Sequence, residues 1–386
     1  MNYFLNEQQE MIRDLSRKVA VEKIRPVAAK HDEEQTFPWD VVRELAAADL
    51  FAIFIPEQYG GLGGGVLELC IAVEELSRAC GGIALALAAS ALGSFPLILF
   101  GSEEQKRKYL PDLAAGKKLA AFALTEPNAG SDAASIQTTA VKDGDSYVLN
   151  GTKQWITNAG EAEIYTVVAM TDRSKGARGA TTFILEKGMP GFEFGKKENK
   201  LGIRASATRE IILRDCRVPK GNVLGAEGLG FIVAMKTFDQ SRPGVAAQAV
   251  GIAQGALDEA MAYARERVQF GKPIASFQGL QFMLADMATE IEAARALVYQ
   301  TARTIDAGEK NIAKESAMCK VFASDVAMKV TINAVQVFGG YGYMKEYPVE
   351  KMMRDAKITQ IYEGTNEIQR GVIASNLIKE YARKKK

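Results

Sequence analysis

Apolar residues in the first third of the chain recur every three or four positions, which is the period of an amphipathic helix. The first run begins after Asn6, which can form a capping box with Gln9, and a second run follows Pro38. The glycine-rich stretch Tyr59–Gly65 matches no phosphate-binding motif and is predicted to be a turn. This pattern predicts an N-terminal helical domain over residues 1–118.

One stretch of that region, Ala79 to Ser102, contains no charged residue and is long enough to cross a bilayer. It is composed of Ala, Gly and Ser rather than Leu and Ile, and Gly93 to Pro96 is expected to interrupt it. These features favour a buried helix over a membrane span. Ser102 and Gln105 then form a second capping box for the next helix.

From about Leu119 the pattern changes to alternation, and β-branched and aromatic residues become frequent. The candidate strands lie at 146–157, 165–172, 181–187 and 209–215, separated by turn-forming dipeptides. They predict a middle antiparallel β domain over residues 119–229, with the last strand near Leu224. Within it, the loop 125–135 (TEPNAGSDAAS) is either an ordinary turn-rich connection or a set of backbone amides that holds an anion or a ring carbonyl.

The helical period returns after Gly230. Ala-rich helices are predicted at 238–255 and 257–267, and a longer amphipathic helix at 280–305. Long Ala-rich helices pack closely against one another, which predicts a four-helix bundle over residues 230–386. The fold class is therefore α+β, mainly α, with the order helical domain, β domain, helical bundle.

Composition narrows the possible chemistry. The 48 basic and 47 acidic residues nearly balance, which argues against nucleic-acid binding, and the basic tail Arg383–Lys386 is interpreted as a solvated end. A single histidine, His31, excludes a Ser-His-Asp triad and an HExxH zinc site, and no metal centre is predicted. The four cysteines have no ligand spacing and are interpreted as reduced, buried thiols. The acidic N-terminus does not resemble a signal peptide, so the predicted location is the bacterial cytoplasm or, after loss of a presequence, an organellar matrix.

The most informative stretch lies near the C-terminus, at residues 358–370 (ITQIYEGTNEIQR). Glu363 stands there between an aromatic ring, Tyr362, and a glycine that lets a ligand approach the backbone. A carboxylate in this setting is a candidate general base. The simpler interpretation is a helix start, because Thr365 or Asn366 can cap the amphipathic run that follows. The local sequence leaves both interpretations open.

Five separated motifs then point to one family. They are ALTEPNAGSD (123–132), QWITN (154–158), RVQFGKP (267–273), QVFGGYGY (336–343) and IYEGTNEIQ (361–369). In this order they cover nearly the full length, and the chain resembles the acyl-CoA dehydrogenase family, most closely its short-chain (butyryl-CoA) branch. The resemblance implies the same three-domain fold, FAD in each subunit and a homotetramer.

The resemblance also implies a reaction. Glu363 would remove the α-proton of an acyl-CoA thioester, the β-hydrogen would leave as hydride to the flavin, and the trans-2-enoyl-CoA would form. The thioester carbonyl would be held by the backbone N–H of Glu363 and a ribityl hydroxyl of the flavin, and the electrons would pass to an electron-transferring flavoprotein. Some branches place the base on the helix that contains Ser241, but no glutamate is found there in this chain.

The matching positions give the implied site residues. FAD would be held by Phe122, Leu124, Thr125, Gly130, Ser131, Trp155, Ile156, Thr157, Arg267, Phe270, Gln278, Gln336, Val337, Phe338, Gly339, Gly340, Thr365, Asn366 and Glu367. The subset from Arg267 to Gly340 would reach the FAD of a neighbouring subunit. Acyl-CoA would be bound by Ser131, Asp239, Gln240, Ser241, Arg242, Tyr362 and Gly364. For Trp155, simple core packing is the alternative.

Several alternatives remain for the substrate and the direction. The small residues from Gly81 to Ser94 leave volume that can admit a cyclic acyl group such as cyclohexanecarboxyl-CoA. Because the uncharged segment has no arginine, a dicarboxylic acyl group such as glutaryl is disfavoured. The enzyme can also run in reverse as an enoyl-CoA reductase. An acyl-CoA oxidase is less favoured because such relatives carry an additional C-terminal domain, and a non-enzymatic flavin- or CoA-binding scaffold is disfavoured by the intact Glu363 and flavin motifs.

Overall fold

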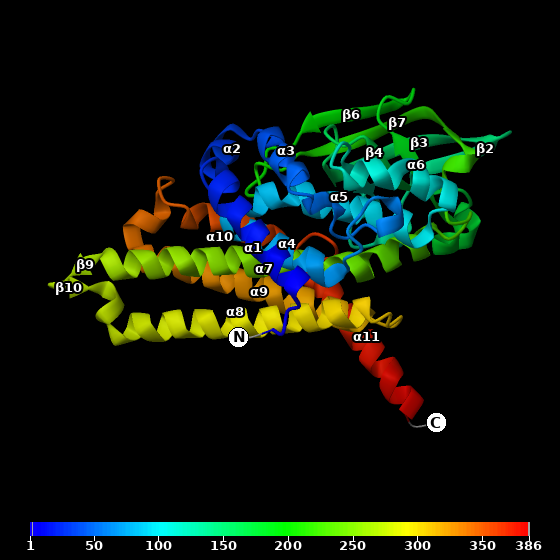
Figure 1. Ribbon diagram of the computed structural model, residues 1–386. Coiled ribbons are helices and arrows are strands. Elements are labelled where there is room, and N and C mark those ends of the chain that lie inside the picture. The colour runs from blue at the N-terminus through cyan, green and yellow to red at the C-terminus, as the bar shows by residue number, and fades with distance from the viewer. Residues whose placement is uncertain (2, 385–386) are drawn as a thin grey trace.

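A computed structural model describes residue 1 and residues 3–384. Short helices of the N-terminal region and one β-sheet lie on a layer of long helices from the C-terminal region (Figure 1). The predicted order of helices, sheet and helical bundle is confirmed. The predicted domain boundaries, 118/119 and 229/230, stay a prediction. Lys385 and Lys386, the end of the basic tail, lie outside the described residues.

Among its described residues, the N-terminal region contains six α-helices. They are α1 (Glu7–Val19), α2 (Ala28–Glu34), α3 (Trp39–Ala47), α4 (Val66–Ala79), α5 (Gly81–Phe100) and α6 (Glu103–Ala114). Both predicted capping boxes are present, because the Asn6 and Ser102 side chains each accept the backbone N–H three residues ahead, of Gln9 and Gln105. Helix α2, with the sequence AAKHDEE, was not predicted from the sequence, since it is too short and polar to show a helical period.

The uncharged segment forms α5, which is buried along most of its length. It meets the length and hydropathy of a membrane span, as does the segment 313–343, but 72% of its most apolar window is buried inside the protein. The prediction of a buried helix is therefore confirmed. The predicted interruption at Gly93–Pro96 is wrong, because α5 continues to Phe100. Gly93 is instead a packing position: an added Cβ would come within 2.6 Å of the Ala121 nitrogen on the neighbouring strand.

The middle region is one eight-stranded sheet with the order β6-β7-β3-β2-β4-β5-β8, and β1 pairs with β4. The strands are β1 (Ala120–Ala123), β2 (Thr139–Asp143), β3 (Ser146–Thr157), β4 (Ile164–Met170), β5 (Ala180–Glu186), β6 (Phe192–Lys197), β7 (Thr208–Pro219) and β8 (Val223–Leu224). Most ladders are antiparallel as predicted, but β4 pairs in parallel with β1 and with β2. The long excursion between β1 and β4 permits this, because parallel neighbours need a crossover connection.

The C-terminal region is a bundle of long helices. They are α7 (Gly230–Glu266), α8 (Gln278–Asp306), α9 (Ala313–Phe338), α10 (Val349–Ile358) and α11 (Asn366–Lys384). A short hairpin, β9 (Val268–Gln269) and β10 (Lys272–Pro273), joins α7 to α8 at one end of the molecule, and α7 runs from there to beneath the sheet (Figure 1).

Helix α7 continues for 37 residues and contains both predicted Ala-rich segments, although Pro243 lies inside it. A proline removes the N–H that would bond the carbonyl four residues earlier, here that of Asp239. The Ser316 hydroxyl on α9 donates to this carbonyl at 2.9 Å, so the orphaned acceptor is satisfied by the neighbouring helix. The hydrogen bond from α9 thus replaces the backbone bond that Pro243 removes from α7.

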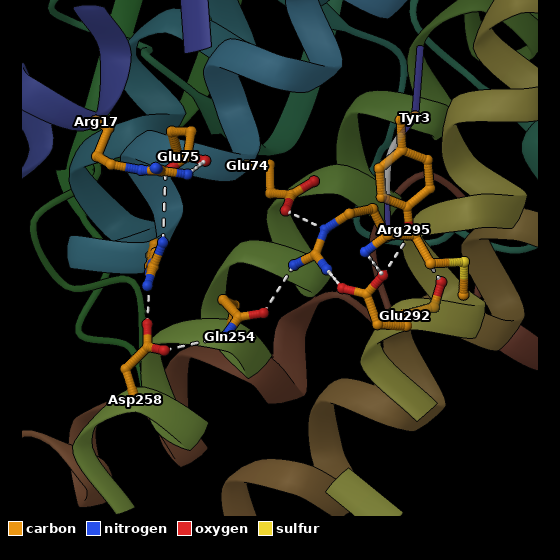
Figure 2. Close-up of polar contacts among 10 residues, drawn as sticks. Tyr3, Arg17, Glu74, Glu75, Gln254, Asp258, Glu292 and Arg295 are labelled. Carbon is orange, nitrogen blue, oxygen red and sulfur yellow. Dashed lines mark hydrogen bonds and ion pairs between the residues drawn. The ribbon is translucent and has the colours of Figure 1, made fainter. Parts of the chain in front are cut away.

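A network of ion pairs holds the N-terminal helices on the bundle (Figure 2). The buried Arg295 of α8 donates to Glu74 of α4 at 2.6 Å and to Gln254 of α7 at 2.8 Å, and it also pairs with Glu292. Burial raises the pKa of Glu74, and the positive charge of Arg295 opposes this shift. Arg17 of α1 pairs with Glu75 beside this network. All four cysteines are buried and unpaired, as predicted.

Candidate active site

An apolar pocket lies where α4 and α5, the ends of β1 and β3, helix α7 and the turn before α11 meet. Its lining residues are Leu69, Val73, Leu85, Ala88, Ala89, Leu92, Phe95, Phe122, Leu124, Thr125, Trp155, Ile156, Thr157, Phe238, Ser241, Gly244, Val245, Gln248, Tyr362 and Glu363. Among these described lining residues, Glu363 carries the only carboxylate and there is no basic side chain.

Glu363 lies in the turn between α10 and α11, in the left-handed backbone region with φ of 54°. This conformation is rare for a residue with a side chain and marks a position held by its surroundings. The carboxylate accepts a hydrogen bond from the Ser241 hydroxyl on α7 at 2.5 Å. Burial raises the pKa of Glu363, while the Ser241 hydrogen bond and the charges of Arg242 and Lys320 oppose the rise.

Tyr362, the neighbouring residue, is tied to the other side of the pocket. Its hydroxyl donates to the side-chain oxygen of Gln248, and the Gln248 amide donates to the Gly81 carbonyl at 2.9 Å. Burial raises the pKa of Tyr362, so the phenol stays protonated and continues to donate. This chain of bonds fixes the turn against α7 and the start of α5.

The helix-cap interpretation is confirmed, whereas the role of Glu363 as a base stays a prediction. Helix α11 begins at Asn366, and the Thr365 hydroxyl accepts the backbone N–H of Ile368 at 3.3 Å. The side chain of Asn366 is buried and bonded to α9: its amide donates to Ser324 at 2.9 Å and to Asp325 at 2.8 Å. The side chain of Asn366 is thus bonded to the bundle, and the predicted place of this residue in the cofactor site stays a prediction. Glu367 is exposed.

Six of the first group of predicted cofactor residues line the pocket, namely Phe122, Leu124, Thr125, Trp155, Ile156 and Thr157. Phe122, Leu124 and Ile156 are buried and form an apolar floor. Trp155 is 59% exposed and takes a left-handed φ of 57°, so its ring is not packed in the core. A flat aromatic face left open beside an apolar floor fits a planar ring system such as a flavin. Gly130 and Ser131 are exposed in the loop nearby.

The loop that carries Thr125 is held by a buried ion pair that the sequence analysis missed. The Lys153 ammonium, which is fully buried, lies 2.7 Å from the Glu126 carboxylate and donates to the Leu124 carbonyl at 3.0 Å. Glu126 also accepts the backbone N–H of Thr138 at 2.9 Å. Burial lowers the pKa of Lys153 to about 8, and the charge of Glu126 opposes this shift. Nothing in the local sequence indicated that Lys153 is buried, because a lysine in a strand is normally exposed.

The second group of predicted cofactor residues lies elsewhere. Arg267, Phe270 and Gln278 surround the β9–β10 hairpin at one end of the bundle (Figure 1). Gln336 and the glycines at 339 and 340 are exposed at the end of α9, and the Arg267 guanidinium lies 5.3 Å from the ring of Tyr341. Val337 and Phe338 are buried there, and Phe338 stacks on Tyr263. Ser241 lies on α7, and Arg267 directly follows the last residue of that helix, Glu266. A separation of 26 positions along the helix places this cluster about 39 Å from the pocket.

Two of the predicted acyl-CoA residues on α7, Asp239 and Arg242, form a charged group together with Lys236. Asp239 is buried between Arg242 and Lys236, at 3.5 Å from each. Burial raises the pKa of Asp239, and these two positive charges oppose the shift. Gln240 is half-buried. Within the described part of the chain, no three His, Cys, Asp or Glu side chains gather as a metal site requires.

Comparisons with known proteins agree with this arrangement. Three sequence families match the chain: "Acyl-CoA dehydrogenase, N-terminal domain" at residues 6–117, "middle domain" at 121–216 and "C-terminal domain" at 228–378. The chain is 50% identical to the short-chain-specific acyl-CoA dehydrogenase of Clostridium acetobutylicum over 98% of its length and 100% of that protein. It is equally identical, 50%, to the acryloyl-CoA reductase (NADH) of Anaerotignum propionicum, with 98% and 96% covered.

A solved structure is as similar. A chain in the structure of the electron transferring flavoprotein of Acidaminococcus fermentans superposes with a TM-score of 0.96 at 52% identity, covering 98% of this chain and 99% of the other. The fold, the pocket and these matches show that the chain belongs to the acyl-CoA dehydrogenase family. It is an FAD-dependent oxidoreductase, and the predicted cofactor is confirmed at the level of the family.

Proposed function

We propose that this enzyme dehydrogenates a short, apolar acyl-CoA to the trans-2-enoyl-CoA, with Glu363 as the base. The observation that carries the proposal is the single carboxylate, Glu363, in a pocket whose other described lining residues are uncharged. FAD, when bound against Trp155 and the floor formed by Phe122 and Ile156, supplies the acceptor for the β-hydrogen and its electron pair.

Glu363 must accept a proton from a weakly acidic carbon. A carboxylate with its ordinary pKa of about 4.3 is a poor base for this task, so a raised pKa improves the match. Burial provides that rise, and an apolar acyl chain would exclude further water from the carboxyl. The α-carbon proton passes to an oxygen of the Glu363 carboxylate. The hydrogen bond that the Ser241 hydroxyl donates to this carboxylate can then rearrange.

The pocket walls favour a short, uncharged acyl group. Aliphatic and aromatic side chains of α4 and α5, among them Val73, Leu92 and Phe95, line the pocket. No described lining residue can pair with a carboxylate at the far end of the acyl chain, so a dicarboxylic substrate would bury an unpaired charge. A cyclic substrate stays an alternative, because the small residues Ala88 and Ala89 face the same space.

The electron acceptor we propose is an electron-transferring flavoprotein. The similarity to a chain in the structure of such a flavoprotein supports this choice. The equal identity to an acryloyl-CoA reductase favours a second candidate, the reverse reaction on a short enoyl-CoA, because the same base and pocket serve both directions. The bacterial relatives support a location in the cytoplasm of a bacterium.

We also propose that FAD is bound between subunits of a homotetramer. The cluster at Arg267, Phe270 and Gln278 lies too far from the pocket to serve the same FAD molecule within one subunit. Phe270 is 93% exposed, as a residue that contacts another chain would be in an isolated subunit. The guanidinium of Arg267 suits a pyrophosphate by charge and geometry. A monomer that retains FAD tightly, observed by light scattering on the holoenzyme, would contradict this proposal.

Anaerobic titration of the holoenzyme tests the reaction. Butyryl-CoA is expected to bleach the flavin absorption band at lower concentrations than octanoyl-CoA, glutaryl-CoA or cyclohexanecarboxyl-CoA. The reduced enzyme titrated with crotonyl-CoA reports on the reverse direction. If none of these thioesters changes the oxidation state of the flavin, the proposed function is wrong. Preferential bleaching by cyclohexanecarboxyl-CoA would replace the linear substrate by the cyclic one.

A further inference from the structure

The backbone on either side of the Glu363–Gly364 peptide bond is held by side chains from three helices. Gln369 of α11 donates to the Glu363 carbonyl at 2.8 Å, and Arg242 of α7 donates to it at 3.3 Å. Lys320 of α9 donates to the next carbonyl, that of Gly364, at 2.9 Å. Two consecutive carbonyls in one turn thus receive three side-chain donors, although neither belongs to a helix.

This turn needs support because its backbone is unfavourable. Glu363 and Gly364 both have positive φ, 54° and 96°. A residue other than glycine in the left-handed region costs of order 1–3 kcal/mol and persists only where the surroundings impose it. A Cβ at Gly364 would lie 2.3 Å from the Gln369 amide nitrogen. The Gln369 amide can therefore take this position only because residue 364 is a glycine.

Lys320 is the least expected of the three donors. It is completely buried, and no described carboxylate lies within ion-pair distance of its ammonium group. Its partners are neutral oxygens, those of Gly364 and of the Asn366 side chain, each at 2.9 Å. Burial lowers the pKa of Lys320 to about 7, and the charge of Glu363 opposes this shift. Such a costly group requires a reason beyond packing, because an apolar side chain would fill the same space more cheaply.

We propose that Lys320 and Gln369 are positioning residues for the reaction: by gripping the carbonyls of Gly364 and Glu363 they fix the turn so that the Glu363 carboxylate points at Ser241 and into the pocket. Neither side chain lines the pocket among the residues described. They therefore act through Glu363. This inference rests on the proposed role of Glu363 as the base.

Lys320→Met keeps the length of the side chain and removes its donors, and Gln369→Met does the same on α11. The holoenzymes are expected to retain FAD and to bind acyl-CoA within about twofold of the unaltered affinity. Reduction of the flavin at saturating butyryl-CoA is expected to fall about 10–100-fold, the range for a reacting group misplaced by about 1 Å. Lys329→Met, which removes an exposed lysine of the same helix, serves as the matched control with an unchanged rate.

A second measurement isolates proton removal from electron transfer. Acetyl-CoA carries α-protons but no β-carbon, so it cannot be dehydrogenated, and exchange of its α-protons in D₂O catalysed by the holoenzyme reports on the base alone. Both methionine variants are expected to slow this exchange as much as they slow flavin reduction.

The possible outcomes separate the two proposals. If Glu363→Gln exchanges and reduces normally, the proposed role of Glu363 as the base fails and this inference falls with it, whereas the dehydrogenation itself stands. If Glu363→Gln is impaired while Lys320→Met and Gln369→Met match the unaltered enzyme, only the positioning role is overturned. Equal losses of binding and rate would also overturn it, because they indicate general disruption. Should Lys320→Met fail to fold, Gln369→Met decides alone.

Discussion

Replacing Glu363 by glutamine is expected to slow reduction of the bound FAD by butyryl-CoA at least ~10²-fold, the lower end for loss of a general base. Glutamine keeps the size and the hydrogen bond to Ser241 but cannot accept the α-proton. FAD content and affinity for acyl-CoA should stay unchanged, because the change removes no packing. Anaerobic stopped-flow absorbance of the flavin band measures the rate, and equilibrium titration measures the binding.

The pH dependence of the unaltered enzyme provides a related check. Only the ionised carboxylate accepts a proton, so the rate should rise with pH as Glu363 deprotonates. Because burial raises its pKa, this rise should lie above the ordinary range for glutamate, and the Glu363→Gln variant should lack it. Glu380→Gln, which alters an exposed carboxylate of α11, is the control. A Glu363→Gln enzyme that reduces its flavin at the normal rate would place the base elsewhere.

Replacing Lys153 by methionine is expected to lower the free energy of unfolding by about 3–5 kcal/mol, the usual effect of breaking a buried ion pair. The variant leaves the Glu126 carboxylate buried without its 2.7 Å partner, and the Leu124 carbonyl loses a donor. The loop from Thr125 to Ser135 carries predicted cofactor contacts, so FAD should also dissociate more readily. Urea unfolding of the apoenzyme and release of FAD on dilution of the holoenzyme measure the two effects.

The double variant Lys153→Met/Glu126→Gln distinguishes the effect of the unpaired Glu126 charge on stability from the effect of the changed side-chain volume at position 153. Removing both charges is expected to recover part of the lost stability, since no uncompensated carboxylate then remains. Thr138 and Gln137 would still donate their backbone N–H groups to the residue at position 126. If Lys153→Met proves as stable as the unaltered protein, the ion pair does not hold this loop.

Much of the fold followed from local signals. The capping boxes at Asn6 and Ser102 and the strand at 146–157 were predicted because each depends on residues close in sequence. The break expected at Gly93–Pro96 failed for a tertiary reason: the glycine admits a neighbouring strand, and the surrounding helices hold α5 together. Likewise, the continuity of α7 through Pro243 depends on a hydroxyl from α9, about 70 residues later in the chain.

The candidate site likewise contains residues that the sequence predicted and residues that it could not predict. Motifs identified Glu363, Tyr362 and Trp155, and the structure brings them to one pocket. The residues that hold them, Lys320 and Lys153, could not be predicted, because a lysine in a helix or strand is normally exposed and only distant segments bury these two. For Asn366, the cofactor contact that its motif indicated stays a prediction, and the bonds of its side chain to α9 could not be predicted from the motif.

Helix α7 has a consequence for how this chain can vary over evolution. Ser241 lies on this unbroken helix at the pocket, and Arg267 directly follows its last residue, Glu266, at the remote cluster. Inserting or deleting one residue between them would turn one end by about 100° relative to the other and shift it by about 1.5 Å. Both positions would then lose their partners together. The segment 241–267 should therefore keep its length in descendants of this protein, whereas the exposed stretch 173–176 is free to lengthen.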